Sequence, residues 1–172
     1  MRRLLFVLIP LFLLAACKTP HKTMFQASPG TVLATLANVY RMHCYTTRHG
    51  IQVAQFATEC PNVALVEHLT AGALDRIGAK DKQMLRGLRL IFVPHVIICG
   101  PPQNDLITLG CTLADGSKSF VFLAGGIATW GRVTAHEFGH AILVLSGKDG
   151  DGGHEDRDFW DAIERIDVKE FE

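Results

Sequence analysis

The sequence predicts a small α+β domain, and three observations support this class. Apolar residues recur at helical spacing before residue 80, runs of branched and aromatic residues occupy residues 88–123, and a second helical pattern covers residues 129–145. A stripe repeating every three to four residues is typical of a packed helix, whereas short apolar runs bounded by turn residues are typical of strands. Their order predicts a short antiparallel sheet packed on the helix at 129–145, with further helices around it.

The first 28 residues are typical of an export signal followed by a tether. A basic start leads into an apolar run at residues 4–14, and two alanines precede Cys17. This run is shorter than the roughly 20 residues that cross a bilayer as a helix, and small residues before a cleavage point are typical of secretory signals. The expected divisions of the chain are a signal peptide at residues 1–16, a tether at 17–28 and the domain at 29–172.

The segment ending at Cys17 reads Leu-Ala-Ala-Cys and resembles the bacterial lipobox. The resemblance implies that Cys17 is acylated and becomes the first residue of a lipoprotein anchored to the lipid bilayer. By the enterobacterial sorting rule, Lys18 after the cysteine favours the outer membrane, facing the periplasm, in the bacterial cell envelope. The alternative is an ordinary cleaved signal in which Cys17 is incidental.

The charge balance argues against a nucleic-acid-binding protein. The whole chain has 17 Lys and Arg residues and 17 Asp and Glu residues, and the loss of Arg2 and Arg3 with the signal leaves a net charge of −2. No cluster of Lys and Arg predicts a basic face of the kind that binds phosphate backbones. The remaining length suits one domain with one core, which we expect to be a monomer.

Besides Cys17, the chain contains Cys44, Cys60, Cys99 and Cys111. An even number of cysteines in an exported chain predicts two disulfides. Of the three possible pairings we favour the local one, Cys44–Cys60 with Cys99–Cys111. A structural zinc site with four cysteine ligands is the alternative, but it lacks the usual CxxC pair.

Two helices are expected before the strands. Ser28 is a suitable N-cap, and the apolar pattern after it extends to Tyr40. Asn62 opens a second helical pattern, which Gly78 ends. We interpret the intervening residues 45–59 as irregular or weakly extended.

Three strand-like runs follow these helices. Residues 88–99 are rich in branched and aromatic residues, with Pro94 marking a bulge or an edge, and residues 106–113 form the second run. An Asp-Gly pair at 115–116 is a hairpin signal before the third run, residues 119–124. This last run has two interpretations: an open edge that an extended peptide joins, or a plain core strand.

The most specific chemical pattern is His-Glu-Phe-Gly-His at residues 136–140. On a helix, His136 and His140 project from nearly the same face, so that both imidazoles can reach one Zn²⁺ at about 2.0–2.1 Å. Glu137 would lie beside that metal, where its carboxylate can take a proton from water. The pattern predicts two metal ligands and a general base. The alternative is a chance match in which both histidines are hydrogen-bonded core residues.

Apolar residues on both sides of this motif predict a helix that is buried except at its metal face. Thr129 is its expected N-cap, and Gly147 stands where a left-handed C-cap residue is expected. Two ligands and a base on one helix resemble the zincin metallopeptidases. The metzincin subgroup is excluded, because Leu143 and Ser146 stand where its glycine and third histidine would be.

A third ligand is expected, since catalytic zinc sites usually have three protein ligands and a fourth position for water. A glycine-rich loop leads to His154, which opens a second amphipathic pattern at residues 154–166. This order resembles the SprT-like group of small zinc metallopeptidases over residues 129–166, and the resemblance implies that His154 is the third ligand. Glu155 and Asp158 are alternatives, and Asp158 would share a helix face with His154.

We therefore expect an envelope-anchored zinc metalloendopeptidase with Glu137 as general base. The ligands of its Zn²⁺ would be His136, His140 and His154. The substrate would be a peptide or an envelope protein, because an export signal argues against the DNA-attached proteins on which SprT-like enzymes act. The rival expectation is a non-catalytic zinc-binding lipoprotein that holds a partner on the same scaffold. Glu137 favours the enzyme, since a structural metal site needs no base.

Overall fold

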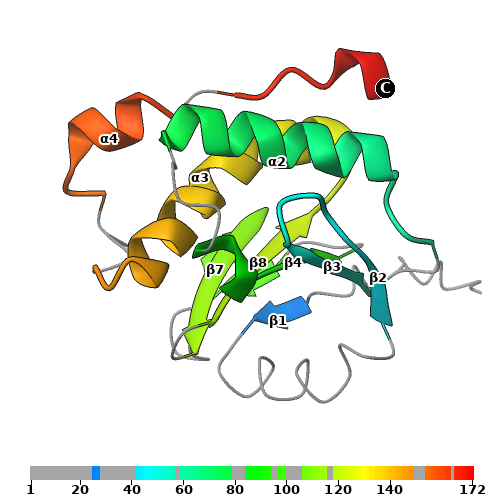
Figure 1. Ribbon diagram of the computed structural model, residues 1–172, viewed down its shortest axis with the longest axis horizontal. Helices are drawn as coiled ribbons and strands as arrows, with labels where there is room; N and C mark the ends of the chain where they lie inside the picture. Colours follow the sequence, from blue (N-terminus) through cyan, green and yellow to red (C-terminus); the bar gives the residue numbers. More distant parts are fainter. Residues whose placement is uncertain are drawn as a thin grey trace, which may run out of the picture.

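The computed structural model describes residues 25–27, 42–56, 59–78, 84–93, 97–99, 106–115, 118–148, 154–163 and 165–172. The predicted signal peptide, Cys17 and the helix expected from Ser28 to Tyr40 lie outside these residues. Within the described ranges the fold is α+β, as predicted. A five-stranded sheet carries two long helices on one face, and a three-stranded sheet accompanies it (Figure 1).

The five-stranded sheet is mixed, not antiparallel as expected. In its order β2-β3-β4-β8-β7, the three central strands are parallel, and the outer strands β2 and β7 are antiparallel to their neighbours. The strands are β2 His43–Thr46, β3 Gln52–Gln55, β4 Leu88–Val93, β7 Gly110–Asp115 and β8 Lys118–Ala124. Both faces of β4 and β8 are buried, as is usual for parallel strands, and their sequences therefore lack polar alternation.

The strand runs expected from the sequence are divided differently in the structure. Residues 88–99 are two strands, β4 and β5, which belong to different sheets, and residues 106–113 are divided between β6 and β7. Residues 45–59 include β3 and part of β2. The second sheet has the order β1-β5-β6, with bounds Phe25–Ala27, Ile97–Cys99 and Leu106–Thr108. Strand β1, at the end of the predicted tether, pairs in parallel with β5.

Helix α2, Val63–Ile77, has the ends that the sequence predicts. The Oδ1 atom of Asn62 accepts hydrogen bonds from the N–H groups of Ala64 and Leu65, at 2.8 and 3.2 Å. These bonds satisfy two donors that the first turn of a helix leaves without partners. Gly78 ends the helix in the left-handed conformation, with φ of 67°. The short 3₁₀ helix η1, Met84–Gly87, comes before β4.

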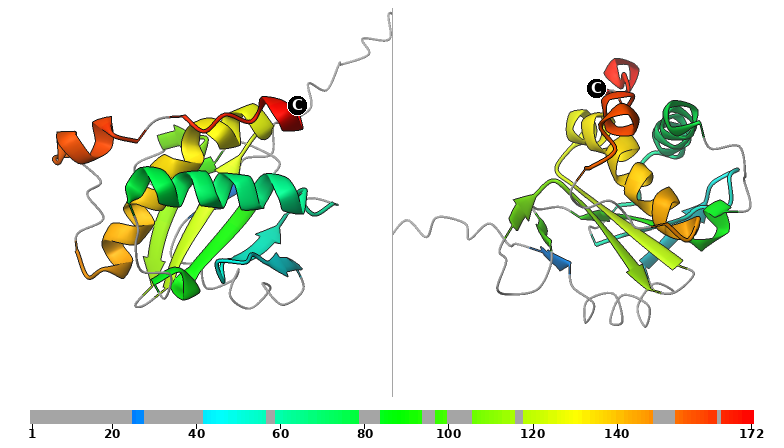
Figure 2. Two further views of the ribbon diagram at one scale, coloured as in Figure 1. Left: turned by 45° about the horizontal axis from the view of Figure 1, so that its top comes forward. Right: turned by 90° about the vertical axis from the view of Figure 1, so that its left-hand side faces the viewer.

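Helix α3, Ile127–Leu145, lies beside α2 on the same face of the sheet (Figures 1 and 2). Its N-cap is Gly126, three residues earlier than expected and without a side-chain cap, so the prediction of Thr129 as N-cap is wrong. The expected left-handed residue after its end is confirmed, since Gly147 has φ of 75°. All of the His-Glu-Phe-Gly-His motif lies inside this helix.

Alternate residues of the central strands face two different cores. Leu90 and Phe92 pack with Phe138 of α3 in the core under the helices. Ile91 and Phe122 face the opposite side, where Ile97 of β5 covers them. Fully buried residues such as Phe138 pack α3 against the sheet. The side of α3 that does not face the core is therefore held in a fixed position beside β7.

The predicted second helix, residues 154–166, is much shorter in the structure. Helix α4 spans only Arg157–Asp161, and the chain then runs extended across α2 and α3 to a 3₁₀ turn η2, Lys169–Phe171 (Figure 2). The extended form is held because the N–H of Ile166 donates to the carbonyl of Gly131 at 2.7 Å, and Ile166 is buried in the core. A side chain at Gly131 would lie 2.8 Å from the Ile166 carbonyl oxygen, so glycine is needed there.

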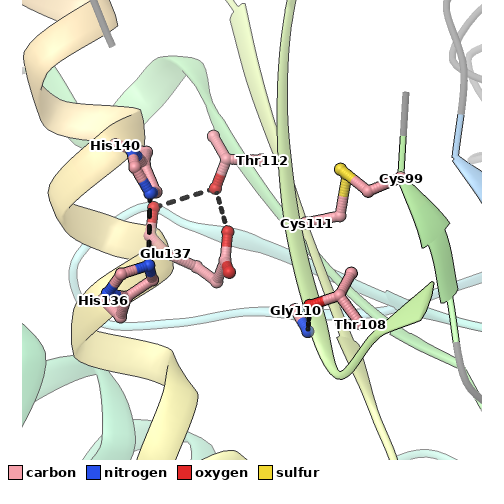
Figure 3. The surroundings of a disulfide bond; sticks show 8 residues. All are labelled: Cys99, Thr108, Gly110, Cys111, Thr112, His136, Glu137 and His140. Atoms are coloured by element: carbon pink, nitrogen blue, oxygen red, sulfur yellow. Dashed lines mark hydrogen bonds between the residues drawn. A yellow bond between two sulfur atoms is a disulfide. The ribbon is translucent and has the colours of Figure 1, made fainter. Parts of the chain in front are cut away.

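Both predicted disulfides are confirmed. Cys44–Cys60 joins β2 to the segment before α2, and Cys99–Cys111 joins β5 to β7 (Figure 3). In the part of the chain that the structure describes, no helix is long and apolar enough to cross a membrane.

Candidate metal centre

Three histidine side chains meet where α3 faces the chain before α4. The Nε2 atoms of His136 and His140 are 3.3 Å apart, and those of His140 and His154 are 3.2 Å apart. One nitrogen from each ring lies within 4.8 Å of the other two. Among the described residues, this is the one group of three or more histidines, cysteines or carboxylates arranged to hold a metal ion.

This arrangement could be shared by one cation. The Nε2 atom of His140 faces a ring nitrogen of His136 and a ring nitrogen of His154. A neutral imidazole has a nitrogen lone pair that can bind a metal ion, so one ion could accept a lone pair from each of the three rings. The three histidines could therefore hold a metal ion.

His136 and His140 lie on α3, whereas His154 lies just before α4, further along the chain. His154 has φ of 53°, in the left-handed region, and it precedes α4 instead of lying on it. The expectation that Asp158 shares a helix face with His154 is therefore wrong. Neither Asp158 nor Glu155 belongs to the three-residue group.

The indole of Trp160 in α4 packs against all three histidine rings. Its ring centroid lies 4.9 Å from that of His136, 4.4 Å from His140 and 4.6 Å from His154. It also lies over Gly139, where an added Cβ would be 2.9 Å from the indole and 3.0 Å from the Ile163 side chain. The glycine of the motif thus leaves room for a side chain that limits how far the three imidazoles can rotate.

Glu137 points from the same helix toward β7 (Figure 3). Its side chain is 6 % exposed, and its Oε2 atom accepts a hydrogen bond from the Thr112 hydroxyl at 2.6 Å. Burial raises the pKa of the Glu137 carboxyl to about 7, and the bond from Thr112 opposes part of that rise. No lysine or arginine among the described residues forms an ion pair with Glu137. A carboxyl in this environment can both accept and release a proton near neutral pH.

Burial acts in the opposite sense on the neighbouring histidine. Burial and, to a smaller extent, repulsion from His140 and His154 together lower the pKa of His136 to about 4. The His136 imidazole is therefore neutral at pH 7 and keeps the lone pair that a metal ligand needs.

A cavity of about 490 Å³ connects these groups with β7. Its walls carry the three histidines and Glu137 on one side and residues of β7, from Gly110 to Ala114, on the other. Within the described residues β7 pairs with β8 alone, and β8 lies between β4 and β7. The interpretation of residues 119–124 as the open edge is therefore wrong, and the core-strand interpretation is right: the edge beside the histidines is β7.

The sequence pointed to Glu137 and to the three histidines but missed Thr112, Gly110 and Trp160. A signal for the first two was present, since Gly110, Thr112 and Ala114 are small residues at alternate positions of one strand. Alternate residues of a strand share a face, and small ones allow a helix side chain to approach closely. Trp160 falls within the amphipathic pattern at residues 154–166, and nothing in the sequence placed α4 over the motif.

Comparisons of the chain with protein-family models, with curated proteins and with solved structures found no match.

Proposed function

We propose that the chain is a zinc-dependent peptidase of the bacterial cell envelope. The observation that carries this proposal is the gathering of three imidazoles and one buried, uncompensated carboxylate in a single cavity beside an open strand edge. A site kept only to hold a metal has no use for Glu137, because a buried carboxylate without a cationic partner lowers stability.

The donor set fits zinc. Two nitrogens bound to one tetrahedral zinc at about 2.0–2.1 Å lie about 3.3 Å apart. The Nε2 atoms of His140 and its two partners are separated by 3.3 and 3.2 Å. Three imidazoles also leave a fourth position for water, as catalytic zinc sites do.

Each residue of the site has a distinct part in the proposed reaction. When bound, zinc supplies Lewis acidity, which makes a water more acidic and polarises the scissile carbonyl. Glu137 accepts the proton of the attacking water and passes it to the leaving amine, a role that a pKa near 7 suits. Trp160 packs against the three imidazoles and limits their rotation.

Strand β7 supports a peptide as substrate. No described strand pairs with its outer side, so an extended peptide could pair there through main-chain hydrogen bonds, which give affinity with little regard for sequence. Among the described residues that line the cavity, only the three histidines and Glu137 are ionisable, and Leu113 and Val144 are among the apolar ones. We therefore expect uncharged residues next to the scissile bond.

The envelope location rests on the lipobox resemblance at Cys17 and is supported by the two disulfides. Disulfides persist in oxidising compartments such as the periplasm and are rare in the cytosol.

The test is the substitution Glu137→Gln in protein that starts after Cys17. We predict that Glu137→Gln keeps one zinc per chain by elemental analysis but lowers kcat by about 10²–10⁴-fold on a mixed peptide library read by mass spectrometry. The matched control is Glu155→Gln, which removes a carboxylate outside the three-histidine group and should change neither quantity. Equal turnover in Glu137→Gln and wild type would overturn the assignment of the base. A wild-type protein that binds zinc but cleaves nothing would favour the rival zinc-binding lipoprotein.

A further inference from the structure

Strand β7 contacts the carboxylate of Glu137 from two positions. Gly110 and Thr112 lie on the face of β7 that meets α3, whereas the Cys111 side chain between them points away, toward Cys99 (Figure 3). The Thr112 Oγ1 atom lies 2.6 Å from Oε2 of Glu137 and 3.0 Å from its main-chain oxygen. A hydroxyl has one proton to donate, and a carboxylate is the stronger acceptor.

Gly110 limits the same carboxylate from the other side. An added Cβ at position 110 would lie 2.5 Å from Oε1 of Glu137 and 2.7 Å from its Cγ. No side chain therefore fits at Gly110 unless the carboxylate moves. The space for Glu137 is bounded by the Gly110 backbone near Oε1 and by the Thr112 hydroxyl at Oε2.

This confinement matters because a glutamate side chain has three rotatable bonds. A proton acceptor that is misplaced by an ångström loses much of its effect, so the orientation of the carboxylate must be set before substrate arrives. Thr112 is the side chain that donates to it, and a buried carboxylate cannot rely on solvent for that partner.

We propose that Thr112 is a positioning residue for Glu137. Its hydroxyl holds Oε2, so that Oε1 is the oxygen left to exchange a proton with the attacking water. Thr112 touches neither substrate nor metal in this role and acts only through Glu137. The inference rests on the proposed peptidase function, and its tests below separate the two.

The first test compares Thr112→Val, which keeps the shape and loses the donor, with Thr112→Ser, which keeps the donor. In Thr112→Val we expect kcat to fall about 10- to 100-fold with KM within about twofold of wild type and one zinc per chain. Thr112→Ser should restore most of the lost kcat. The matched control is Thr46→Val on the exposed end of β2, far in sequence from the site. An unchanged kcat, or a rise in KM alone, would overturn the proposal.

The second test needs no turnover. In metal-free protein, the unfolding equilibrium is measured for wild type, Thr112→Val, Glu137→Ala and the double variant. If the hydroxyl holds the carboxylate, Thr112→Val raises the unfolding constant at least about tenfold more when Glu137 is present than when it is replaced. If Thr112→Val has the same effect with and without Glu137, the contact is absent and the inference is wrong. A wild-type protein without peptidase activity would overturn the proposed function but would not affect the unfolding result for Thr112 and Glu137.

A third variant covers the case in which Thr112→Val does not fold. Gly110→Ala introduces a Cβ where Oε1 lies and should displace the carboxylate from the opposite side. We expect the same fall in kcat at unchanged KM and zinc content. Wild-type turnover in folded Gly110→Ala would contradict the claim that β7 fixes Glu137.

Discussion

Gly139 allows an indole to lie across the two turns of α3 that carry His136 and His140. An added Cβ at 139 would lie 2.9 Å from the indole, so a larger residue would displace Trp160, whose ring also contacts His154. Imidazole rings that are held on their outer side lose fewer rotational states on binding a metal. Gly139 thus contributes to the site although it offers no ligand atom.

We predict that Trp160 reports metal binding. The chain has two tryptophans, and Trp130 is engaged elsewhere, edge-on to Phe92 at 4.6 Å. Paramagnetic Co²⁺ bound by the three histidines should therefore quench mainly the Trp160 emission. Titration should quench the fluorescence of Trp130→Phe and leave that of Trp160→Phe nearly unchanged. Quenching in Trp160→Phe that matches Trp130→Phe would mean that the metal binds at another place.

The buried state of Glu137 predicts how stability depends on pH. The pKa of this carboxyl is raised from 4.5 to about 7 by folding, so its contribution is fully present below pH 4.5 and is lost as pH rises through 7. Glutamine does not titrate. In metal-free protein, Glu137→Gln should gain about 3 kcal/mol in free energy of unfolding relative to wild type between pH 4.5 and pH 8.

Urea unfolding of both proteins at several pH values measures this difference. The contribution of His136 is common to both and cancels to a first approximation. A difference that does not change with pH would mean that Glu137 is exposed to solvent.

At the scale of elements, helix α2 was predictable because both of its ends are set by nearby residues, whereas the start of α3 and the length of α4 were not predicted correctly. Asn62 and Gly78 bound α2 through hydrogen bonds and backbone conformations that involve only near neighbours. The bounds and order of the strands were harder to predict, because strands pair with partners that lie far along the chain. Residues 88–99 form one apolar run, and only the sheet order shows that β4 and β5 belong to different sheets. Strand β3 has four residues, too few for a period to be visible.

The residues of the site also divide into those set by local sequence and those set by contacts far along the chain. His136, Glu137 and His140 follow from the spacing of one helix, so sequence alone brings them together. His154 depends on the path of a loop, and its assignment came from a resemblance. Thr112 belongs to a strand whose edge position the sequence left open, so the small residues of that strand indicated a close approach but not that Glu137 would make it.

The two disulfides are predicted to differ in their effect on activity. Their separations of 16 and 12 residues predict similar stabilisation, about 3 kcal/mol each in the chain-entropy model. Cys111, however, lies between the two residues of β7 that confine Glu137. Replacing Cys99 and Cys111 by serine should therefore lower kcat as well as stability, whereas the same change at Cys44 and Cys60 should lower stability alone.

Urea unfolding and peptide cleavage at a temperature where all three proteins are folded provide the measurements. Equal kcat values in the two double variants would mean that the disulfide between β5 and β7 has no part in placing the site.

At the scale of the whole molecule, a metal would connect two parts of the chain that are otherwise joined by a loop. His154 begins the C-terminal segment, which returns across the helices and buries Ile166 and Val168 in the main core. A cation shared with α3 would hold both ends of that segment. Its binding energy would then add to the free energy of unfolding, because the unfolded chain does not assemble the three ligands.

We predict that zinc at about 100 times its dissociation constant raises the free energy of unfolding by about 2.7 kcal/mol over protein in a chelator. His154→Ala should lose most of this gain at the same zinc concentration, and Asp158→Asn should keep it. Denaturation in zinc-buffered and chelator-containing solutions provides the comparison. A gain of the same size in His154→Ala would exclude His154 as a ligand.

The backbone at His154 suggests why that position holds a ring at all. A φ of 53° is adopted most readily by glycine. Two of the three residues before His154 are glycines, so a glycine at 154 would form a turn there with less strain. Histidine there carries a conformational penalty of roughly 1 kcal/mol. This penalty would be offset if the ring nitrogen of His154 binds the metal of the proposed site.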